Sequence, residues 1–151
     1  MVVRISSPQF EQGGHMPNKY GKLLENKSPP LKFQDVPPSS KSLVLAVDDP
    51  DSKKVSGKIW DHWIVWNIDP TVSKFPEDSV VDGQEGINDF KERGWGGPNP
   101  PDEAHEYRFI LYAVDVELDI PKDSKKKDVY TAIEGHVIEK SELRAYFSPV
   151  S

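Results

Sequence analysis

The chain of 151 residues contains no cysteine, which excludes disulfide bonds, zinc–thiolate sites and thiol catalysis. It also lacks any apolar run near the roughly 20 residues that a membrane-spanning helix needs. The first residues, 1–6, do not contain the long apolar core of a signal peptide. From these absences we expect a cytoplasmic protein without stable membrane insertion.

Basic residues are outnumbered: Lys and Arg total 19 against 25 Asp and Glu, for a formal net charge of −6. A nucleic-acid-binding surface needs an excess of positive charge against phosphate, so no nucleic acid is expected as a partner. The length suits one domain, and neither a repeat nor a linker is apparent. We therefore expect a single domain over residues 1–151.

Proline and glycine are plentiful, with 14 and 10 copies, and many lie within residues 1–41, where long helices are not expected. Residues 42–47 form an apolar run typical of a strand buried on both faces. Residues 59–68 and 107–118 are rich in β-branched and aromatic side chains, which strands favour. The polar stretch 70–93 predicts a long excursion over the surface. The chain is therefore predicted to be mainly β.

The C-terminal part has a different pattern. Val129, Ile133 and Val137 recur at a spacing of four, which predicts a helix that begins in the Lys run 125–127 with Ser124 as its cap. Residues 141–143 predict the start of a second short helix or of a strand.

Asp49-Pro50-Asp51 follows the first predicted strand directly. Proline biases the residue before it toward an extended conformation, in which residues two apart point the same way. Asp49 and Asp51 would then present two carboxylates to one space. The alternative is an ordinary turn, because Asp and Pro are common turn residues.

His62 lies within the apolar strand 59–68, next to Asp61. A period of two places His62 on the same face as Trp60, Ile64 and Trp66. Such a histidine is often a core residue with satisfied hydrogen bonds. However, either Asp61 or His62 must lie where its burial is compensated, which makes a functional role a competing interpretation.

The segment 96–101 reads Gly-Gly-Pro-Asn-Pro-Pro and cannot form regular structure. Its glycines allow backbone amides to approach a ligand and form an anion-binding concavity. A rigid connector and a polyproline-type ligand motif are the alternatives. Beyond it, His105 and Tyr107 share one face of the next strand, either as a pair of donors to an oxyanion or as an ordinary pair at a strand edge.

The order of these motifs, DPD, then DHW, then GGPNPP followed by HEY, resembles the phosphatidylethanolamine-binding protein family, which includes the Raf kinase inhibitor proteins. The similarity extends over nearly the whole chain and is strongest to the compact bacterial and archaeal branch. Other segments that resemble the family are Ser7-Pro8-x-Phe10 with Gly13 and Pro17, Ser28-Pro29-Pro30-Leu31 with Val36-Pro37, Phe109 to Ala113, and Ala132-Ile133-x-Gly135-His136-Val137 as its C-terminal helix.

The resemblance implies a large antiparallel sheet packed on a smaller one, with short peripheral and C-terminal helices. It also implies a pocket for phosphate-like anions or phosphorylated small molecules, with no cofactor and no metal. A non-enzymatic binding module follows, which regulates or inhibits a serine protease or a protein kinase. The residues that the family motifs place in the pocket are Asp49, Asp51, His62, Gly97, Asn99, His105 and Tyr107.

Other functions stay open. The protein would otherwise be a sensor of a small phosphorylated metabolite with no protein target, or a hydrolase or metal-dependent enzyme that uses the Asp, His and Tyr side chains. A homodimer is also compatible with the sequence.

Several residues depart from the family pattern at the expected rim of the pocket. Ser52-Lys53 replaces the usual Ala-Pro, Glu106 replaces an Arg, Asn99 occupies a glycine position, and residues 102–104 form a short passage to His105. Two aspartates repel an anion, so we expect a division of roles. Loop amides, His105 and Tyr107 would contact the anion, while Asp49 or Asp51 accepts a hydrogen bond from a histidine or from the loop backbone. One aspartate could instead meet a cationic head group such as ethanolamine.

Overall fold

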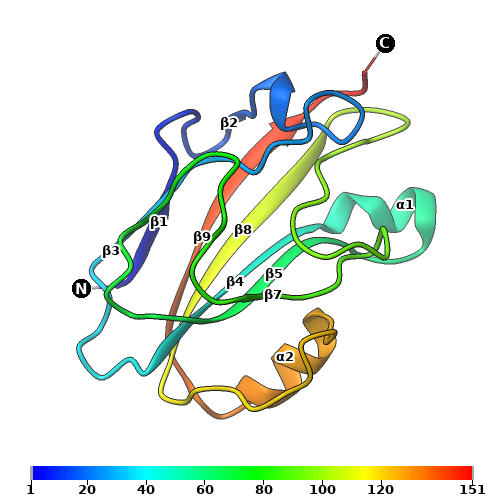
Figure 1. Cartoon of the computed structure of the whole chain (residues 1–151). Coiled ribbons are helices and arrows are strands. Elements are labelled where there is room, and N and C mark those ends of the chain that lie inside the picture. Colours follow the sequence, from blue (N-terminus) through cyan, green and yellow to red (C-terminus); the bar gives the residue numbers. More distant parts are fainter. Residues whose placement is uncertain (1, 151) are drawn as a thin grey trace.

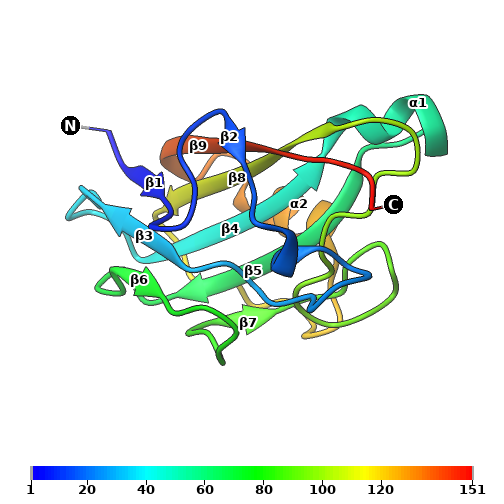
Figure 2. The ribbon, with the colours of Figure 1, turned by 90° about the horizontal axis from the view of Figure 1, so that it is seen from above.

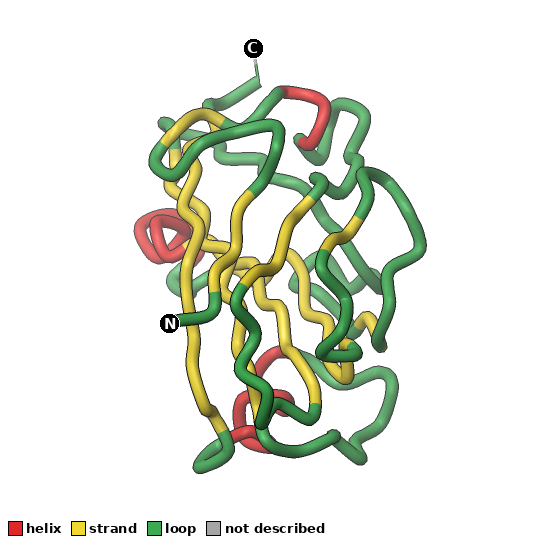
Figure 3. Tube along the Cα trace, turned by 90° about the vertical axis from the view of Figure 1, so that its left-hand side faces the viewer, coloured by secondary structure: helices red, strands yellow, loops and turns green. Residues whose placement is uncertain are grey.

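The computed structural model describes residues 2–150 and contains two β-sheets with short helices at their periphery (Figures 1 and 3). The larger sheet has the strand order β2-β9-β8-β4-β5-β7, and the smaller has the order β1-β3-β6. All pairings are antiparallel except that of β2 with β9. The strands are β1 (Arg4–Ser6), β2 (Gly14–His15), β3 (Leu31–Gln34), β4 (Ser42–Asp49), β5 (Trp60–Ile68), β6 (Lys74–Phe75), β7 (Gln84–Glu85), β8 (His105–Val114) and β9 (Val137–Phe147).

The three strands predicted most strongly from sequence are confirmed as β4, β5 and β8, which lie side by side in the larger sheet. The third, predicted over 107–118, runs from His105 to Val114 and ends before residues 115–118. Every residue of β4 is buried, as its continuous apolar run predicts. The polar stretch 70–93 contributes only the two-residue strands β6 and β7 and otherwise forms turns and irregular chain. The prediction of a mainly β fold with a larger and a smaller sheet is confirmed.

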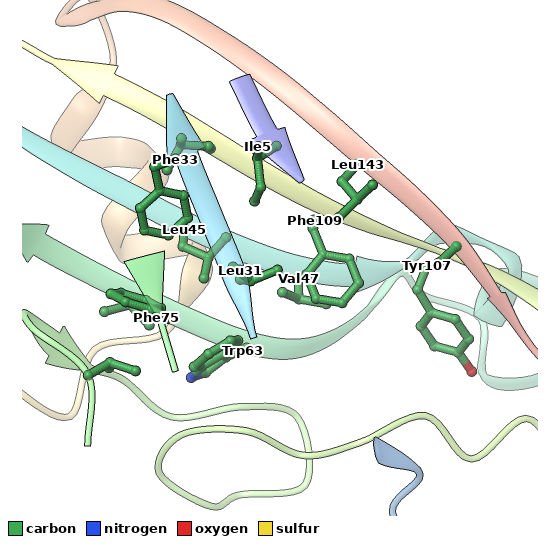
Figure 4. Packing of buried hydrophobic residues seen from close by; sticks show 14 of the residues in the cluster. Ile5, Leu31, Phe33, Leu45, Val47, Trp63, Phe75, Tyr107, Phe109 and Leu143 are labelled. Atoms are coloured by element: carbon green, nitrogen blue, oxygen red, sulfur yellow. The ribbon is translucent and has the colours of Figure 1, made fainter. Parts of the chain in front are cut away.

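The larger sheet is covered on both faces, which creates two hydrophobic cores (Figure 2). On one face the small sheet packs Ile5, Leu31 and Phe33 against the side chains of β4, β5 and β8. Figure 4 shows this packing, in which Tyr107 lies at one end with its hydroxyl directed away from the other labelled side chains. On the opposite face, α2 (Lys126–Ile133) buries Val129 and Ile133 against the second core.

The C-terminal helix is shorter than the sequence pattern predicts. It ends at Ile133, and Gly135 adopts a φ of +81° that turns the chain into β9. Val137 therefore begins a strand and is not the third helical position, and residues 141–143 belong to that same strand. The helix start is also displaced, because Lys125 and not Ser124 is the N-cap residue, with Asp128 accepting from the Lys125 backbone amide at 2.9 Å.

The remaining helical segments are single turns. These are the 3-10 turns η1 (Asn18–Tyr20) and η2 (Pro50–Ser52) and the helix α1 (Lys53–Ser56). Among residues 2–150, no helix has the length and apolarity to cross a bilayer.

Candidate functional site

The candidate site lies at one end of the larger sheet, where β4 ends and its two neighbours begin. Because β4 runs antiparallel to both β5 and β8, its last residue, Asp49, comes beside the first residues of those strands. Three segments that are distant in sequence therefore meet there, as the motif order indicates.

A cavity of about 240 Å³ opens at this edge of the sheet. Its wall combines polar groups from the strand ends with aromatic rings and the proline-rich loop. No lysine or arginine lines it within the described part of the chain. The lining residues are Asp49, Ser52, Val55, Ser56, Trp60, His62, Phe90, Asn99, Pro100, Pro101, His105 and Tyr107.

The segment Asp49-Pro50-Asp51 is a turn, so of the two interpretations open from sequence the turn is confirmed and the extended segment with two parallel carboxylates is wrong. Pro50 begins the 3-10 turn η2, and the Asp49 side chain caps it by accepting from the Asp51 amide at 3.0 Å. The Asp51 carboxylate turns away from the cavity and accepts from the backbone amide of Glu106 at 2.9 Å. Asp51 thus fastens the turn to β8 and does not line the cavity.

His105 is clamped between two carboxylates. Its Nδ1 lies 2.5 Å from Asp49 and its Nε2 lies 2.8 Å from Asp102, while its side chain is 1% exposed. Burial favours the neutral ring, but the hydrogen bonds to Asp49 and Asp102 outweigh it and raise the pKa of His105 above its ordinary value. The expectation that an aspartate accepts from a histidine is therefore confirmed. However, both ring nitrogens are occupied, so His105 offers no free donor to an anion.

The pKa of His62 shifts in the opposite direction. Its Nδ1 donates to the carbonyl oxygen of Gly96 at 2.7 Å, and burial lowers the pKa of its ring to about 4. The ring is therefore neutral near pH 7, and its Nε2 is left as an acceptor. The rings of Tyr107 and Phe90 pack edge-on against it, with centroids at 5.2 and 5.5 Å.

A β-bulge corrects the prediction of which face His62 occupies. Val47 pairs with Trp63 but Asp48 pairs with Asp61, so His62 is an extra residue in β5. Alternation is broken there, and His62 lies on the face of Tyr107 and Trp63, not on that of Ile64 and Trp66. The bulge is what brings His62 to the cavity.

Two further residues that line the cavity, Tyr107 and Trp60, carry a hydrogen-bond donor. Burial, together with the neighbouring Asp49 carboxylate, raises the pKa of the Tyr107 hydroxyl, which keeps it protonated as a donor. Trp60 lines the cavity, and its indole Nε1 is buried without a hydrogen-bond partner among residues 2–150. An indole N–H only donates, so it suits an acceptor on a ligand.

The loop glycines have a structural explanation that the sequence did not reveal. The Gly97 amide donates to the Asn26 side chain at 2.8 Å, and the Gly96 amide donates to the His62 carbonyl at 2.9 Å. A Cβ on Gly97 would lie 2.0 Å from the Tyr20 carbonyl oxygen. These amides are therefore already bonded, and the prediction that they form an anion-binding concavity is not supported.

Five of the seven residues predicted from sequence line the cavity, whereas Asp51 and Gly97 do not. Whether any of them binds a ligand stays a prediction. Sequence reasoning missed Trp60, although its spacing of two from His62 placed the two on one face. It also missed Phe90 and Asp102, for which no local pattern gave a signal. Within residues 2–150, no cluster of three or more potential metal ligands occurs.

Comparison with known proteins identifies the family. The family model described as phosphatidylethanolamine-binding protein matches residues 6–148. A UPF0098 protein of Chlamydia trachomatis is 40% identical over 144 residues, covering 93% of this chain and 95% of the relative. One from Methanothermobacter thermautotrophicus is 38% identical over 147 residues, with the same coverage of 93% and 95%.

Solved structures agree with this assignment. A putative phosphatidylethanolamine-binding protein homologue from Chlamydia trachomatis superposes with a TM-score of 0.92 at 39% identity, covering 96% of each chain. YbcL of Escherichia coli, described as a new member of the mammalian family, has a TM-score of 0.90 at 27% identity, covering 100% of each chain. The chain belongs to the phosphatidylethanolamine-binding protein family.

Proposed function

We propose that this protein is a non-enzymatic binding module whose cavity accepts a phosphate-like anion or a phosphorylated small molecule. The observation that carries the proposal is the set of polar groups around a small cavity, one of which, the Trp60 Nε1, has no hydrogen-bond partner among residues 2–150. The Trp60 Nε1 and the Tyr107 hydroxyl are donors, and the neutral His62 ring has an acceptor at Nε2. A phosphate monoanion has oxygens for the two donors and at least one P–OH group, one in a monoester and two in inorganic phosphate, for His62.

The charges at the cavity favour a singly protonated phosphate over a dianion. Two carboxylates, Asp49 and Asp102, contact the single ring of His105, and no lysine or arginine lines the wall within the described residues. A dianion would be repelled, whereas a monoanion brings a proton that can bond to His62. Since the second pKa of a phosphate monoester is about 6, we expect affinity to rise as the pH falls from 7 to 5.

The regulatory part of the proposal rests on the rim of the cavity. The loop 98–103 is stiffened by three prolines, and a preorganised loop enters a partner's cleft with little loss of conformational entropy. We propose a serine protease or a protein kinase as the target of this inhibition. Titration of trypsin-like and elastase-like proteases and of a protein kinase, each with excess protein, tests this part. Full activity of every enzyme at all molar ratios would contradict it.

A metabolite sensor without a protein target is the second candidate. The ion pair between Lys54 and Glu103, at 2.7 Å, connects the α1 rim of the cavity with the opposite loop. A ligand that closes or opens this contact would change the rim without any partner. This function predicts ligand-dependent protection of residues 53–56 and 99–104 in hydrogen exchange, with no enzyme inhibited.

Calorimetry with inorganic phosphate and with O-phosphoethanolamine tests the binding site itself. Tyr107→Phe removes one donor from the wall and should weaken binding about tenfold, which corresponds to about 1.4 kcal/mol for a hydrogen bond to a charged group. Tyr112→Phe is the matched control, because Tyr112 lies on the opposite face of the same strand, bonded to Tyr130 at 2.9 Å. Absence of binding to the native protein, or equal losses in both variants, would contradict the proposal.

A further inference from the structure

A cluster of four charged side chains lies on the face of the larger sheet opposite the cavity. Arg108 on β8 donates two hydrogen bonds to Asp48 on β4, at 2.7 and 2.8 Å. Lys126, from the first turn of α2, contacts Asp48 at 3.0 Å and Asp61 on β5 at 2.5 Å. The cluster therefore connects three adjacent strands and the helix above them.

The cluster is largely buried and its charges balance. Asp48 is 1% exposed, Lys126 13%, Asp61 15% and Arg108 23%, with two carboxylates against two cations. Buried ions are expensive to desolvate, and removal of one partner leaves another charge without compensation. The geometry of this cluster is therefore tightly determined, unlike that of an exposed ion pair.

The cluster and the cavity share their backbone. Successive side chains of a strand point to opposite faces, so a residue fixed on one face restrains its neighbour on the other. Each strand that contributes a residue to the cluster also contributes an adjacent residue to the cavity wall. The neighbouring pairs are Asp48 with Asp49, Asp61 with His62, and Arg108 with Tyr107.

The bulge makes the position of His62 depend more on the charged cluster than the positions of Asp49 and Tyr107 do. A bulge interrupts the hydrogen-bond ladder, so the ladder alone does not fix the bulged residues. Here Asp61 and His62 together oppose Asp48. Lys126 bridges Asp48 and Asp61 directly across that irregularity, and thereby holds the backbone on both sides of it.

We propose that Lys126 is a positioning residue for the cavity: by bridging Asp48 and Asp61 from the far face of the sheet, it fixes the bulge that directs His62 into the cavity. The helix α2 then contributes to the binding site indirectly, although none of its residues lines the cavity. The inference deepens the proposed function and rests on it only for the consequence that ligand affinity depends on Lys126.

The test uses the full chain without ligand first. Nitrogen-15 NMR of the histidine rings reports the tautomer and environment of His62. Lys126→Met keeps the length of the side chain but removes its charge, and should shift the His62 ring signals. Lys126→Arg, which can still bridge two carboxylates, should restore them. Lys127→Met is the matched control on an exposed position of the same helix and should leave them unchanged.

If Lys126→Met does not fold, Asp61→Asn provides the same test, because it keeps the shape of the side chain and weakens the bridge. His62 signals that are identical to the native ones in a folded Lys126→Met or Asp61→Asn variant would overturn the inference. So would an equal shift in Lys127→Met.

Calorimetry with inorganic phosphate then separates the two proposals. A loss of about tenfold in affinity in Lys126→Met, restored in Lys126→Arg, supports both. Shifted His62 signals in a protein that binds no phosphate in its native form would support the positioning role and contradict the proposed ligand. Native-like phosphate affinity in a variant with shifted signals would overturn the claim that affinity depends on Lys126.

Discussion

Asp102 occupies the ring nitrogen of His105 that the contact with Asp49 leaves free. Its carboxylate lies 2.8 Å from Nε2, and its side chain is 37% exposed. It is thus an anion supplied by the chain itself. A ligand that uses His105 must displace Asp102, and one that does not must tolerate its charge.

Replacement of this carboxylate by an amide should therefore strengthen anion binding. We expect Asp102→Asn to bind inorganic phosphate about tenfold more tightly, since an amide is a weaker competitor for a charged donor by about 1.4 kcal/mol. Calorimetry at pH 7 measures this. Glu103→Gln is the control for a general loss of negative charge in the same loop. An equal gain in the two variants would assign the effect to net charge alone.

His62 makes the stability of the fold depend on pH in the acid range. Burial lowers the pKa of its ring to about 4. Below pH 6.5, therefore, the His62 ring is protonated in the unfolded chain but still neutral in the folded protein. The free energy of unfolding is therefore undiminished by this effect above pH 6.5. It falls progressively as the pH drops toward 4, by about 3 kcal/mol in total.

Urea unfolding of the native protein and of His62→Asn, at pH 7 and at pH 4.5, isolates this contribution. The amide can still donate to the Gly96 carbonyl but does not titrate, so the variant should lose less stability on acidification. His105 and the carboxylates are common to both proteins and cancel in the comparison. Equal losses in both proteins would show that His62 titrates normally in the folded state.

At the scale of elements, close packing of the loop 96–101 against η1 predicts a specific sensitivity. Gly97→Ala would place a methyl group 2.0 Å from the Tyr20 carbonyl oxygen and 2.8 Å from the Lys22 amide nitrogen. Main-chain atoms cannot rotate aside, so we expect a loss of about 3 kcal/mol in unfolding free energy. Because Asn99 and Pro100 follow in the same loop, phosphate affinity should fall as well.

Gly135→Ala serves as the comparison in thermal unfolding and calorimetry. It introduces strain at a φ of +81° but meets no atom within 4 Å, and it lies at the end of α2. We expect a cost of about 1 kcal/mol and an unchanged affinity. A Gly97→Ala variant as stable as Gly135→Ala would contradict the close contact with Tyr20.

The elements also show which inferences a sequence permits. The strand predicted at residues 42–47 was recognisable because its apolar run reflects burial on both faces, whereas its last two residues, Asp48 and Asp49, gave no such signal. The turn at Pro50 was one of two interpretations that the local residues allowed. The bulge at His62 was not predictable, since it depends on how β5 pairs with β4. The clamp on His105 was predictable only in part: Asp49 belongs to a recognisable motif, whereas Asp102 lies in a loop that departs from it.

At the scale of the whole molecule, the strand order predicts a gradient of local stability. The strands β8 and β4 are central in the larger sheet, while β2 and β7 are two-residue strands at its edges. Native-state hydrogen exchange should therefore be slowest for amides of β4 and β8, with opening free energies near that of global unfolding. The edge strands should exchange fastest among the strands of this sheet. Comparable protection at the centre and the edges would contradict this order.

The meeting of three distant segments at one end of the sheet has a kinetic consequence. Asp49 and His105 are separated by 56 positions, and contact between them requires that β4 and β8 have already paired. Such long-range pairing is slow, because the entropy of loop closure is lost before the stabilising contacts between the two strands form. No partly folded intermediate that lacks this pairing can hold the cavity. A ligand of this cavity would then retard unfolding of the finished protein and leave the early steps of folding unaffected.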